Sequence, residues 1–178
     1  DGKAGIQNVR RNASMIFQDP STSLNPTLKI STQMLDILKS QFKKESRETY
    51  QRMMLEALGA LSMPAPERVL GSYPVQLSGG MRQRVCIAMA LMKDTELMLA
   101  DEPTTALDVT IEEQILELLD QLVREKNKSL ILVSHALGAI RKITDRVYVM
   151  YAGNIVEAGM TREVFERPKH PYTIGLLA

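Results

Sequence analysis

Residues 97–103 read Leu-Met-Leu-Ala-Asp-Glu-Pro, and this stretch decides the fold class. Four apolar residues are followed at once by two carboxylates and a proline. A short apolar run with charge and turn signals after it is typical of a strand buried on both faces of a parallel sheet. Open α/β sheets bind ligands at the carboxyl ends of their strands, so Asp101 and Glu102 are expected to stand where a ligand binds.

The next residues predict a crossover to a second parallel strand. Thr110 and Glu113 have the capping-box spacing at the start of an apolar stripe with the 3.6-residue period of a helix. A second apolar run, Leu-Ile-Leu-Val, then occupies residues 130–133. Strand, helix and strand in this order imply a right-handed crossover. The helical stripe comprises Ile111, Ile115, Leu118, Leu119 and Leu122.

A helical region precedes this unit. The texture of residues 27–92 predicts helices, which Pro64 and Pro66 interrupt, and residues 85–92 are apolar all round, as in a buried helix. Residues 14–17 predict an initial strand. The chain is therefore expected to be an α/β protein with a helical subdomain between its first strand and the rest of the parallel sheet.

The last part of the chain predicts a hairpin. A helix is expected from Ser134 to about Ile143. Residues 146–151 and 155–158 then alternate in polarity around the turn Ala152-Gly153-Asn154. The α/β layer would thus close with antiparallel strands.

Composition excludes several classes of protein. The 178 residues include 22 basic and 21 acidic side chains and are 44% hydrophobic, so neither disorder nor a basic nucleic-acid surface is expected. The longest apolar run, residues 85–92, is far below the roughly 20 residues that a membrane helix needs. Residues 1–14 are too polar for a signal peptide. Cys86 has no second cysteine for a disulfide, which fits a reducing compartment. We expect a soluble globular chain of one domain.

The pair Asp101–Glu102 suits a magnesium nucleotide. Asp101, still aligned with the strand, would hold Mg²⁺ directly or through water. Glu102, one residue further on, would orient and polarise an attacking water. An isolated Asp-Glu pair also occurs as a solvated acidic turn or a helix cap, and the pair alone leaves both interpretations open.

A second candidate site lies at residues 77–84, Leu-Ser-Gly-Gly-Met-Arg-Gln-Arg, where a glycine turn joins the buried helix. Free backbone N–H groups, the helix dipole and the Ser78 hydroxyl would together bind an anion such as phosphate. In the alternative interpretation, Ser78 only caps the helix.

Two further polar residues follow predicted strands. His135 comes two residues after the 130–133 strand, on the edge that carries the two carboxylates, and would hydrogen-bond a terminal phosphate or the attacking water. Gln18 follows the first strand and would reach metal or water through its amide. Taken alone, each is more often a structural residue than a functional one.

Together, these segments resemble the ATP-binding cassette (ABC) ATPases. Five motifs in the order of that family would be improbable by chance. They are similar to its glutamine loop at Gln18, signature motif at 77–84, Walker B strand at 97–103, D-loop at 106–108 and switch histidine at Ser134-His135.

Finer features are similar to the ATPase subunits of bacterial dipeptide, oligopeptide and nickel importers, and the resemblance covers nearly the whole chain. These features are Phe17-Gln18-Asp19-Pro20 with Ser23-Leu24-Asn25-Pro26, Tyr73-Pro74-Val75-Gln76, Thr104-Thr105-Ala106-Leu107-Asp108 and Pro168-Lys169-His170-Pro171-Tyr172-Thr173.

The resemblance implies a P-loop NTPase (RecA-like) α/β fold with an inserted helical subdomain and with its N-terminal strands missing. Residues 1–26 and 94–160 would form the RecA-like part, residues 27–93 the helical subdomain, and residues 161–178 the start of a C-terminal peptide-importer extension.

The resemblance also implies a composite site, because two ATPase domains of that family sandwich two ATP molecules head to tail. Glu102, His135 and Gln18 would be catalytic, and Asp101 and Gln18 would bind Mg²⁺, for the nucleotide on their own side. The residues that would bind the nucleotide of the opposite subunit or cross the interface are Ser78, Gly79, Gly80, Gln83 and Asp108.

The implied activity is ATP hydrolysis in an importer of dipeptides, oligopeptides or nickel, driven by closure of the dimer on ATP. The partners would be a second ABC ATPase subunit and transmembrane permease subunits, with no nucleic acid. The protein would lie at the cytoplasmic face of the inner membrane as a peripheral subunit.

Two departures from the family pattern matter. The 178 residues contain no phosphate loop of the form G-x-x-x-x-G-K-[ST] and not the upstream aromatic residue that stacks on adenine, so we expect a fragment that is inactive alone. Ala136 follows the switch histidine where relatives usually have aspartate, and loss of that carboxylate would weaken the orientation of the histidine loop.

Two other functions fit parts of the pattern. A non-transport ABC-type ATPase acting on nucleic acid or ribosomes is disfavoured by the near-neutral charge and by the importer-like segments. A catalytically silent regulatory ABC domain is disfavoured because Glu102, Gln18 and His135 are all present.

Overall fold

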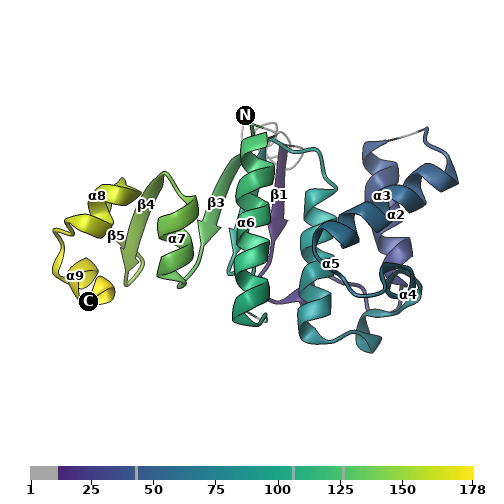
Figure 1. Ribbon diagram of the computed structural model, residues 1–178, viewed down its shortest axis with the longest axis horizontal. Coiled ribbons are helices and arrows are strands. Elements are labelled where there is room, and N and C mark those ends of the chain that lie inside the picture. The colour runs from purple at the N-terminus through teal and green to yellow at the C-terminus, as the bar shows by residue number, and fades with distance from the viewer. Residues whose placement is uncertain (1–11, 43, 106, 126) are drawn as a thin grey trace. The chain divides into compact units, whose positions relative to one another are not determined.

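The protein is described by a computed structural model that covers residues 12–42, 44–105, 107–125 and 127–178 (Figure 1). These residues form two compact units, one that ends at Val133 and one that begins at Ser134. The division falls inside the predicted RecA-like part, residues 94–160. In the described part of the chain, no strand ladder crosses it.

A parallel sheet forms the centre of the first unit. Its strands are β1 (Ala13–Ile16), β2 (Leu97–Asp101) and β3 (Ser129–Val133), in the order β1-β2-β3. Ile16 pairs with Ala100 and Asp101 with Val133, so the strands end at the same edge. The predicted strands and their parallel pairing are confirmed.

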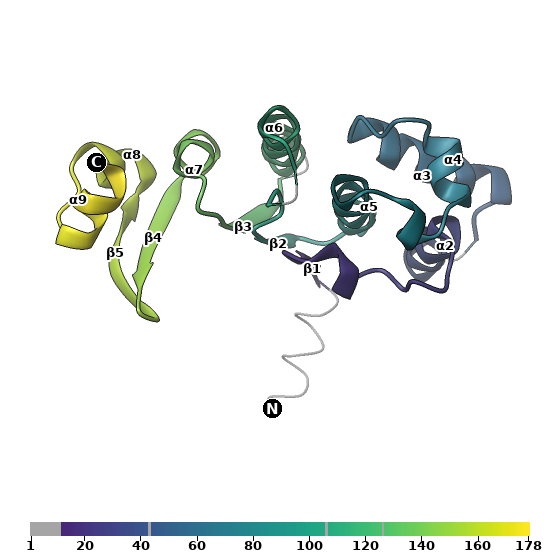
Figure 2. The same cartoon turned by 90° about the horizontal axis from the view of Figure 1, so that it is seen from below.

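Two helices cover one face of this sheet. Figure 2 shows α5 (Gly79–Leu91) and α6 (Val109–Glu125) on the same side of β1, β2 and β3. On this face, Ile16 of β1 and Met98 of β2 are 1% and 4% exposed. Apolar burial of this kind is the main favourable term in folding.

In the described part of the chain, the second face of the sheet is uncovered. Ile131 and Val133 are each 54% exposed and Met15 is 41% exposed. For β3, the prediction of burial on both faces is therefore wrong on one face, because no element of the described ranges covers Ile131 and Val133.

The predicted helical region is confirmed. It contains α2 (Ile30–Gln41), α3 (Arg47–Ala60), α4 (Pro66–Gly71) and α5, with short 3-10 turns η1 (Pro20–Thr22) and η2 (Pro74–Gln76). As predicted, prolines separate α3 from α4, and Pro66 is at the start of α4. The helices α2 and α3 contact each other, and each buries apolar residues four positions apart, Met34 and Leu38 in α2 and Met54 and Leu58 in α3.

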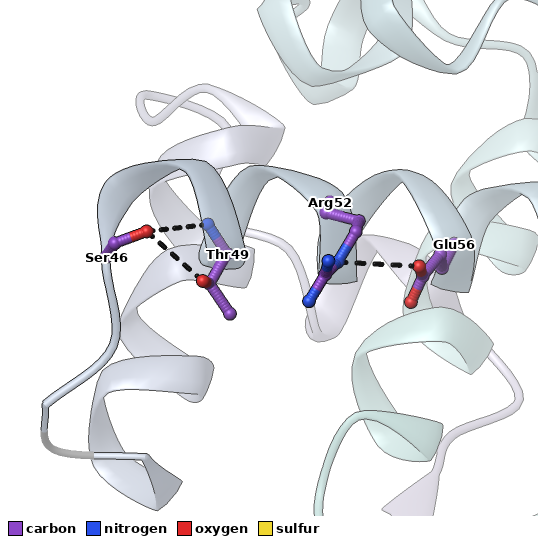
Figure 3. A network of polar contacts seen from close by, with 4 residues as sticks. All are labelled: Ser46, Thr49, Arg52 and Glu56. Carbon is purple, nitrogen blue, oxygen red and sulfur yellow. Dashed lines mark hydrogen bonds and ion pairs between the residues drawn. The ribbon is translucent and has the colours of Figure 1, made fainter.

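The start of α3 is fixed by a side-chain cap (Figure 3). The Ser46 Oγ accepts a hydrogen bond from the Thr49 N–H at 3.1 Å. Arg52 and Glu56 form an exposed ion pair at 3.7 Å one turn further on. A cap of this kind stabilises a helix by about 1 kcal/mol, whereas an exposed i,i+4 pair adds only about 0.3–0.5 kcal/mol.

The start of α6 differs from the predicted capping box. The helix begins at Val109, and the Asp108 Oδ1 accepts the Ile111 N–H at 3.0 Å. Thr110 is therefore inside the helix, and the predicted cap is wrong by two residues. Along the predicted stripe, Ile115 and Leu119 are at most 2% exposed.

The second unit contains the predicted helix and hairpin. Its elements are α7 (Leu137–Ile143), β4 (Arg146–Tyr151), β5 (Asn154–Met160), α8 (Thr161–Glu166) and α9 (Pro171–Leu177). Ala152 and Gly153 have φ values of 47° and 78°, so the hairpin turns through two left-handed residues. The Glu157 carboxylate accepts the N–H groups of Lys169 and His170 at 2.9 and 3.0 Å, which fixes the start of α9.

Among the helices of the described segments, none combines the length and the apolarity required to cross a bilayer.

Candidate active site

The carboxyl edge of the parallel sheet brings two predicted site residues together. Gln18 follows β1 by two residues, and Glu102 directly follows β2. The Gln18 Nε2 donates a hydrogen bond to the Glu102 Oε2 at 3.1 Å. The two residues are 84 positions apart, so their contact depends on the parallel pairing of β1 with β2.

The backbone of Glu102 is held in an unusual conformation. Its φ is 42°, in the left-handed region that residues other than glycine rarely adopt. The Glu102 N–H donates to the Val133 carbonyl at 2.8 Å, which extends the contact with β3 by one residue. Such strain costs on the order of 1–3 kcal/mol and persists where surrounding contacts impose it. The chain therefore turns at Glu102 and leaves the direction of β2, the strand that contains Asp101.

Thr105 is a site residue that the sequence analysis missed. Its Oγ1 donates to the Glu102 Oε2 at 2.9 Å and also lies 3.2 Å from the Glu102 carbonyl oxygen. Thr105 and Gln18 therefore both orient the same carboxylate oxygen. The available sequence signal was a hydroxyl residue three positions after the acidic residue, a spacing at which local side-chain hydrogen bonds form.

The segment after Gln18 is also fixed locally. Asp19 caps η1, and its Oδ1 accepts hydrogen bonds from the Ser21 Oγ at 2.6 Å and the Ser21 N–H at 2.8 Å. These bonds, the hydroxyl first and the N–H second, lower the pKa of Asp19 from its usual 3.8. Asp19 therefore acts as a charged anchor for the turn beside Gln18.

Asp101 and Gln18 supply donors that fit Mg²⁺. Asp101 ends β2 and is half-buried beside the edge. Its carboxylate and the Gln18 Oε1 are hard oxygen ligands, which Mg²⁺ prefers. In the described part of the chain, no group of three or more His, Cys, Asp or Glu residues could hold a metal alone. Mg²⁺ usually takes only one or two protein ligands and completes its shell with water and phosphate, so the two residues fit the ion.

The N-terminus of α5 forms what we call the helix tip, which comprises Ser78, Gly79 and Gly80. Ser78 is exposed, and its Oγ accepts the Met81 N–H at 3.3 Å. Ser78 therefore caps the helix, as the alternative interpretation requires. A Cβ built on Gly79 would meet no atom within 4 Å, and its φ is not left-handed. The fold of this chain therefore gives no steric reason for glycine at position 79.

Gln83 does not belong to the helix tip. Its side chain is 0% exposed, and its Nε2 donates to the Pro103 carbonyl at 2.6 Å and to the Phe17 carbonyl at 3.4 Å. A fully buried amide cannot touch a nucleotide bound at the surface. The prediction that Gln83 contacts the nucleotide is therefore wrong, because Gln83 lies on the face of α5 that packs against the interior.

The remaining predicted residues lie outside this contact. Asp108 is exposed and caps α6, while Ala106 of the predicted D-loop is outside the described residues. His135 is an exposed residue of the second unit, and its approach to Glu102 stays a prediction. Ala136 is the N-cap residue of α7 and makes no side-chain cap.

Comparison with known protein families agrees with this geometry. The family model described as "ABC transporter" matches residues 2–105, which include Gln18, the helix tip and Glu102. The chain belongs to the ABC transporter family.

Bacterial ABC proteins are similar to this chain over most of its length. It is 51% identical over 174 residues to the oligopeptide transport ATP-binding protein OppD of Bacillus subtilis (strain 168), covering 97% of this chain and 48% of the relative. It is 49% identical over 164 residues to the dipeptide transport ATP-binding protein DppD of the same strain, covering 92% and 49%. This ABC chain thus spans about half the length of these two relatives.

A solved ABC cassette supports the fold assignment. The chain superposes on the ATP-binding cassette MJ0796, in its dimeric post-hydrolysis state bound to ADP and Pi, with a TM-score of 0.79 at 30% identity. The match covers 91% of this chain and 68% of that one. The predicted ABC ATPase fold, a P-loop NTPase with a parallel sheet, is confirmed.

Proposed function

We propose that this chain belongs to the ATP-hydrolysing subunit of an ABC importer for peptides. The observation that carries the proposal is the contact between Gln18 and Glu102 at the carboxyl edge of the sheet. In this contact, Gln18 of the glutamine loop hydrogen-bonds the carboxylate of Glu102, which belongs to the Walker B motif. Near-equal numbers of basic and acidic residues, 22 and 21, do not favour an ABC-type ATPase that acts on nucleic acid.

Glu102 would act as the general base of ATP hydrolysis. Gln18 and Thr105 bind its Oε2, and these bonds hold the carboxylate in one orientation while it accepts a proton from the attacking water. Asp101 and the Gln18 Oε1 would hold Mg²⁺, which supplies charge neutralisation on the phosphates when bound. His135 would complete the site by hydrogen-bonding the terminal phosphate or the attacking water.

The helix tip would act on the nucleotide of a partner subunit. Ser78 and Gly79 are at the N-terminus of a 13-residue helix, where backbone N–H groups and the helix dipole favour an anion. Open space at Gly79 is consistent with close approach by a phosphate from outside the chain. Asp108 would cross the same interface. ATP would therefore be enclosed between two ATPase subunits.

The names of the two bacterial relatives favour peptides over nickel as the transported solute. The partners would be permease subunits, and the protein would be peripheral at the cytoplasmic face of the inner membrane. Because these 178 residues contain no G-x-x-x-x-G-K-[ST] sequence, the activity is proposed for the full-length protein.

The proposal is tested with the full-length protein assembled with its permease subunits in liposomes. We expect Mg²⁺-dependent ATP hydrolysis, and uptake of oligopeptides that requires ATP. Hydrolysis stimulated by RNA or ribosomes, with no peptide uptake, would contradict the transport function. Absence of any hydrolysis would contradict the ATPase function.

A further inference from the structure

Gln83 is a fully buried polar side chain whose contacts are not explained by packing. Its exposed fraction is 0%, and its Oε1 has no hydrogen-bond partner among the residues that the structure describes. Burying an amide oxygen without a partner is unfavourable, and an apolar side chain of similar length would fill the same space without this cost. The favourable contribution of this side chain therefore comes from its Nε2 donor group.

The two carbonyls that receive this donor flank the catalytic pair. Phe17 directly precedes Gln18, and Pro103 directly follows Glu102. The Gln83 Nε2 donates to the Pro103 carbonyl at 2.6 Å and lies 3.4 Å from the Phe17 carbonyl. One amide thus connects the backbone beside Gln18 to the backbone beside Glu102 from the interior, below their surface contact at 3.1 Å.

We propose that Gln83 is a positioning residue that holds Gln18 and Glu102 at hydrogen-bonding distance. The inference rests on the proposed ATPase function, since it assigns to Gln83 an effect on turnover. Gln83 is also on the helix whose N-terminus is the helix tip, five residues after Ser78. The same amide therefore fixes the carboxylate edge relative to α5.

The test replaces the amide by a side chain of similar length without a donor, Gln83→Met, in the full-length protein. We expect kcat for ATP hydrolysis to fall at least tenfold while the KM for ATP stays within twofold. A crystal structure of the variant is expected to show the Gln18 Nε2 and the Glu102 Oε2 more than 3.5 Å apart.

Gln33 provides a matched control. It is 8% exposed, and its Nε2 likewise donates to two backbone carbonyls, Asn25 at 3.0 Å and Leu28 at 2.9 Å. Neither carbonyl adjoins Gln18 or Glu102. Gln33→Met should leave kcat within twofold of wild type, although it too removes the donor of a buried amide. Equal losses of kcat in both variants would overturn the proposal.

A double substitution separates positioning from general damage. If Gln83 acts through Gln18, then Gln83→Met should lower kcat less than twofold in a Gln18→Ala background. An undiminished tenfold loss in that background would overturn the proposal. If Gln83→Met does not fold, Gln83→Glu keeps the shape and regains a donor when protonated, so its activity relative to wild type should rise as the pH falls from 8 to 6. A flat ratio would overturn the proposal.

The failure of the proposed function would look different. A wild-type protein without ATPase activity would refute that function, while the distance between Gln18 and Glu102 in the crystal structure of the Gln83 variant would still decide the role of Gln83.

Discussion

The carboxylate edge, which is the carboxyl edge of the parallel sheet with Gln18 and Glu102, and the helix tip are both in the first compact unit. Contacts within the chain explain the structure of the edge but not that of the tip. At the edge, Glu102 contacts Gln18 and Thr105, so its orientation is explained by neighbours in the same chain. At the tip, Gly79 has open space where a side chain would stand. The fold thus explains the edge through contacts of its own but gives no steric reason for glycine at position 79, and our proposal assigns the tip to a partner subunit. Substitutions at the edge should therefore affect chemistry, and substitutions at the tip should affect association.

The largest expected effect is at the edge. In the full-length protein, Glu102→Gln keeps the size of the side chain but removes the general base. Hydrolysis is expected to fall at least about 100-fold, as is typical for loss of a general base, while ATP binding is retained. The measurements are phosphate release and the elution volume of the protein with and without ATP, which should show an ATP-bound dimer.

Glu113→Gln is the matched control for this variant, because Glu113 is an exposed carboxylate on α6. Its hydrolysis should equal that of wild type. Unchanged hydrolysis in Glu102→Gln would remove Glu102 from the role of general base.

The second prediction concerns the helix tip. Gly79→Gln places a neutral, helix-favouring side chain in open space, so the free energy of unfolding should change by no more than about 0.5 kcal/mol. Formation of the ATP-bound dimer in the Glu102→Gln background should nevertheless weaken at least tenfold, measured by analytical ultracentrifugation. Gly59→Gln, at another glycine with no atom within 4 Å of a built Cβ, should leave the dimer intact. Equal dimer formation by all three proteins would show that the tip is not an interface.

The third prediction concerns Thr105, one of the two residues that hydrogen-bond the Glu102 carboxylate at the edge. Thr105→Val removes the hydroxyl that donates to the Glu102 Oε2 and leaves Gln18 in place. Loss of one such hydrogen bond, about 1 kcal/mol, should lower kcat about three- to tenfold. Thr105→Ser retains the hydroxyl and should keep most of the activity in the same phosphate-release assay. If Val and Ser give the same kcat, the hydroxyl does not orient the carboxylate.

The smallest effect is expected beside His135. Ala136 is the N-cap residue of α7 and makes no side-chain cap, whereas aspartate at such a position can accept an N–H of the first helical turn. Ala136→Asp should raise the free energy of unfolding of the second unit by about 1 kcal/mol, measured by urea denaturation. Ala136→Leu should give no such gain. A stability unchanged by aspartate would mean that the start of α7 is not limited by its cap.

The sequence predicted the elements whose signals are local. Apolar runs placed β2 and β3, the 3.6-residue period placed α6, and alternation around Gly153 placed the hairpin. These features depend on neighbours within a few residues, which a pattern can represent. The family motifs then placed Gln18 and Glu102 on one edge, where the structure brings them into contact.

The features that the sequence did not reveal depend on contacts between distant segments. Whether a helix residue such as Gln83 points to the interior depends on the 20 residues that separate it from Pro103 and on how they fold back. The prediction of burial on both faces of the strands assumed a covering layer for residues such as Ile131, and the described elements supply one on a single face. Asp108 caps α6 in place of Thr110, because Asp108 directly precedes the helix and its carboxylate accepts the N–H of Ile111.

The central claim is that the helix tip of one subunit completes the nucleotide site at the carboxylate edge of another. A crystal structure of the full-length Glu102→Gln protein with ATP and Mg²⁺ tests it most directly. The account predicts that the Ser78 Oγ and the Gly79 N–H of one subunit lie within hydrogen-bonding distance of the γ-phosphate held beside Asp101 of the other. ATP bound by a single subunit, with the helix tip in solvent or against its own chain, would contradict the claim.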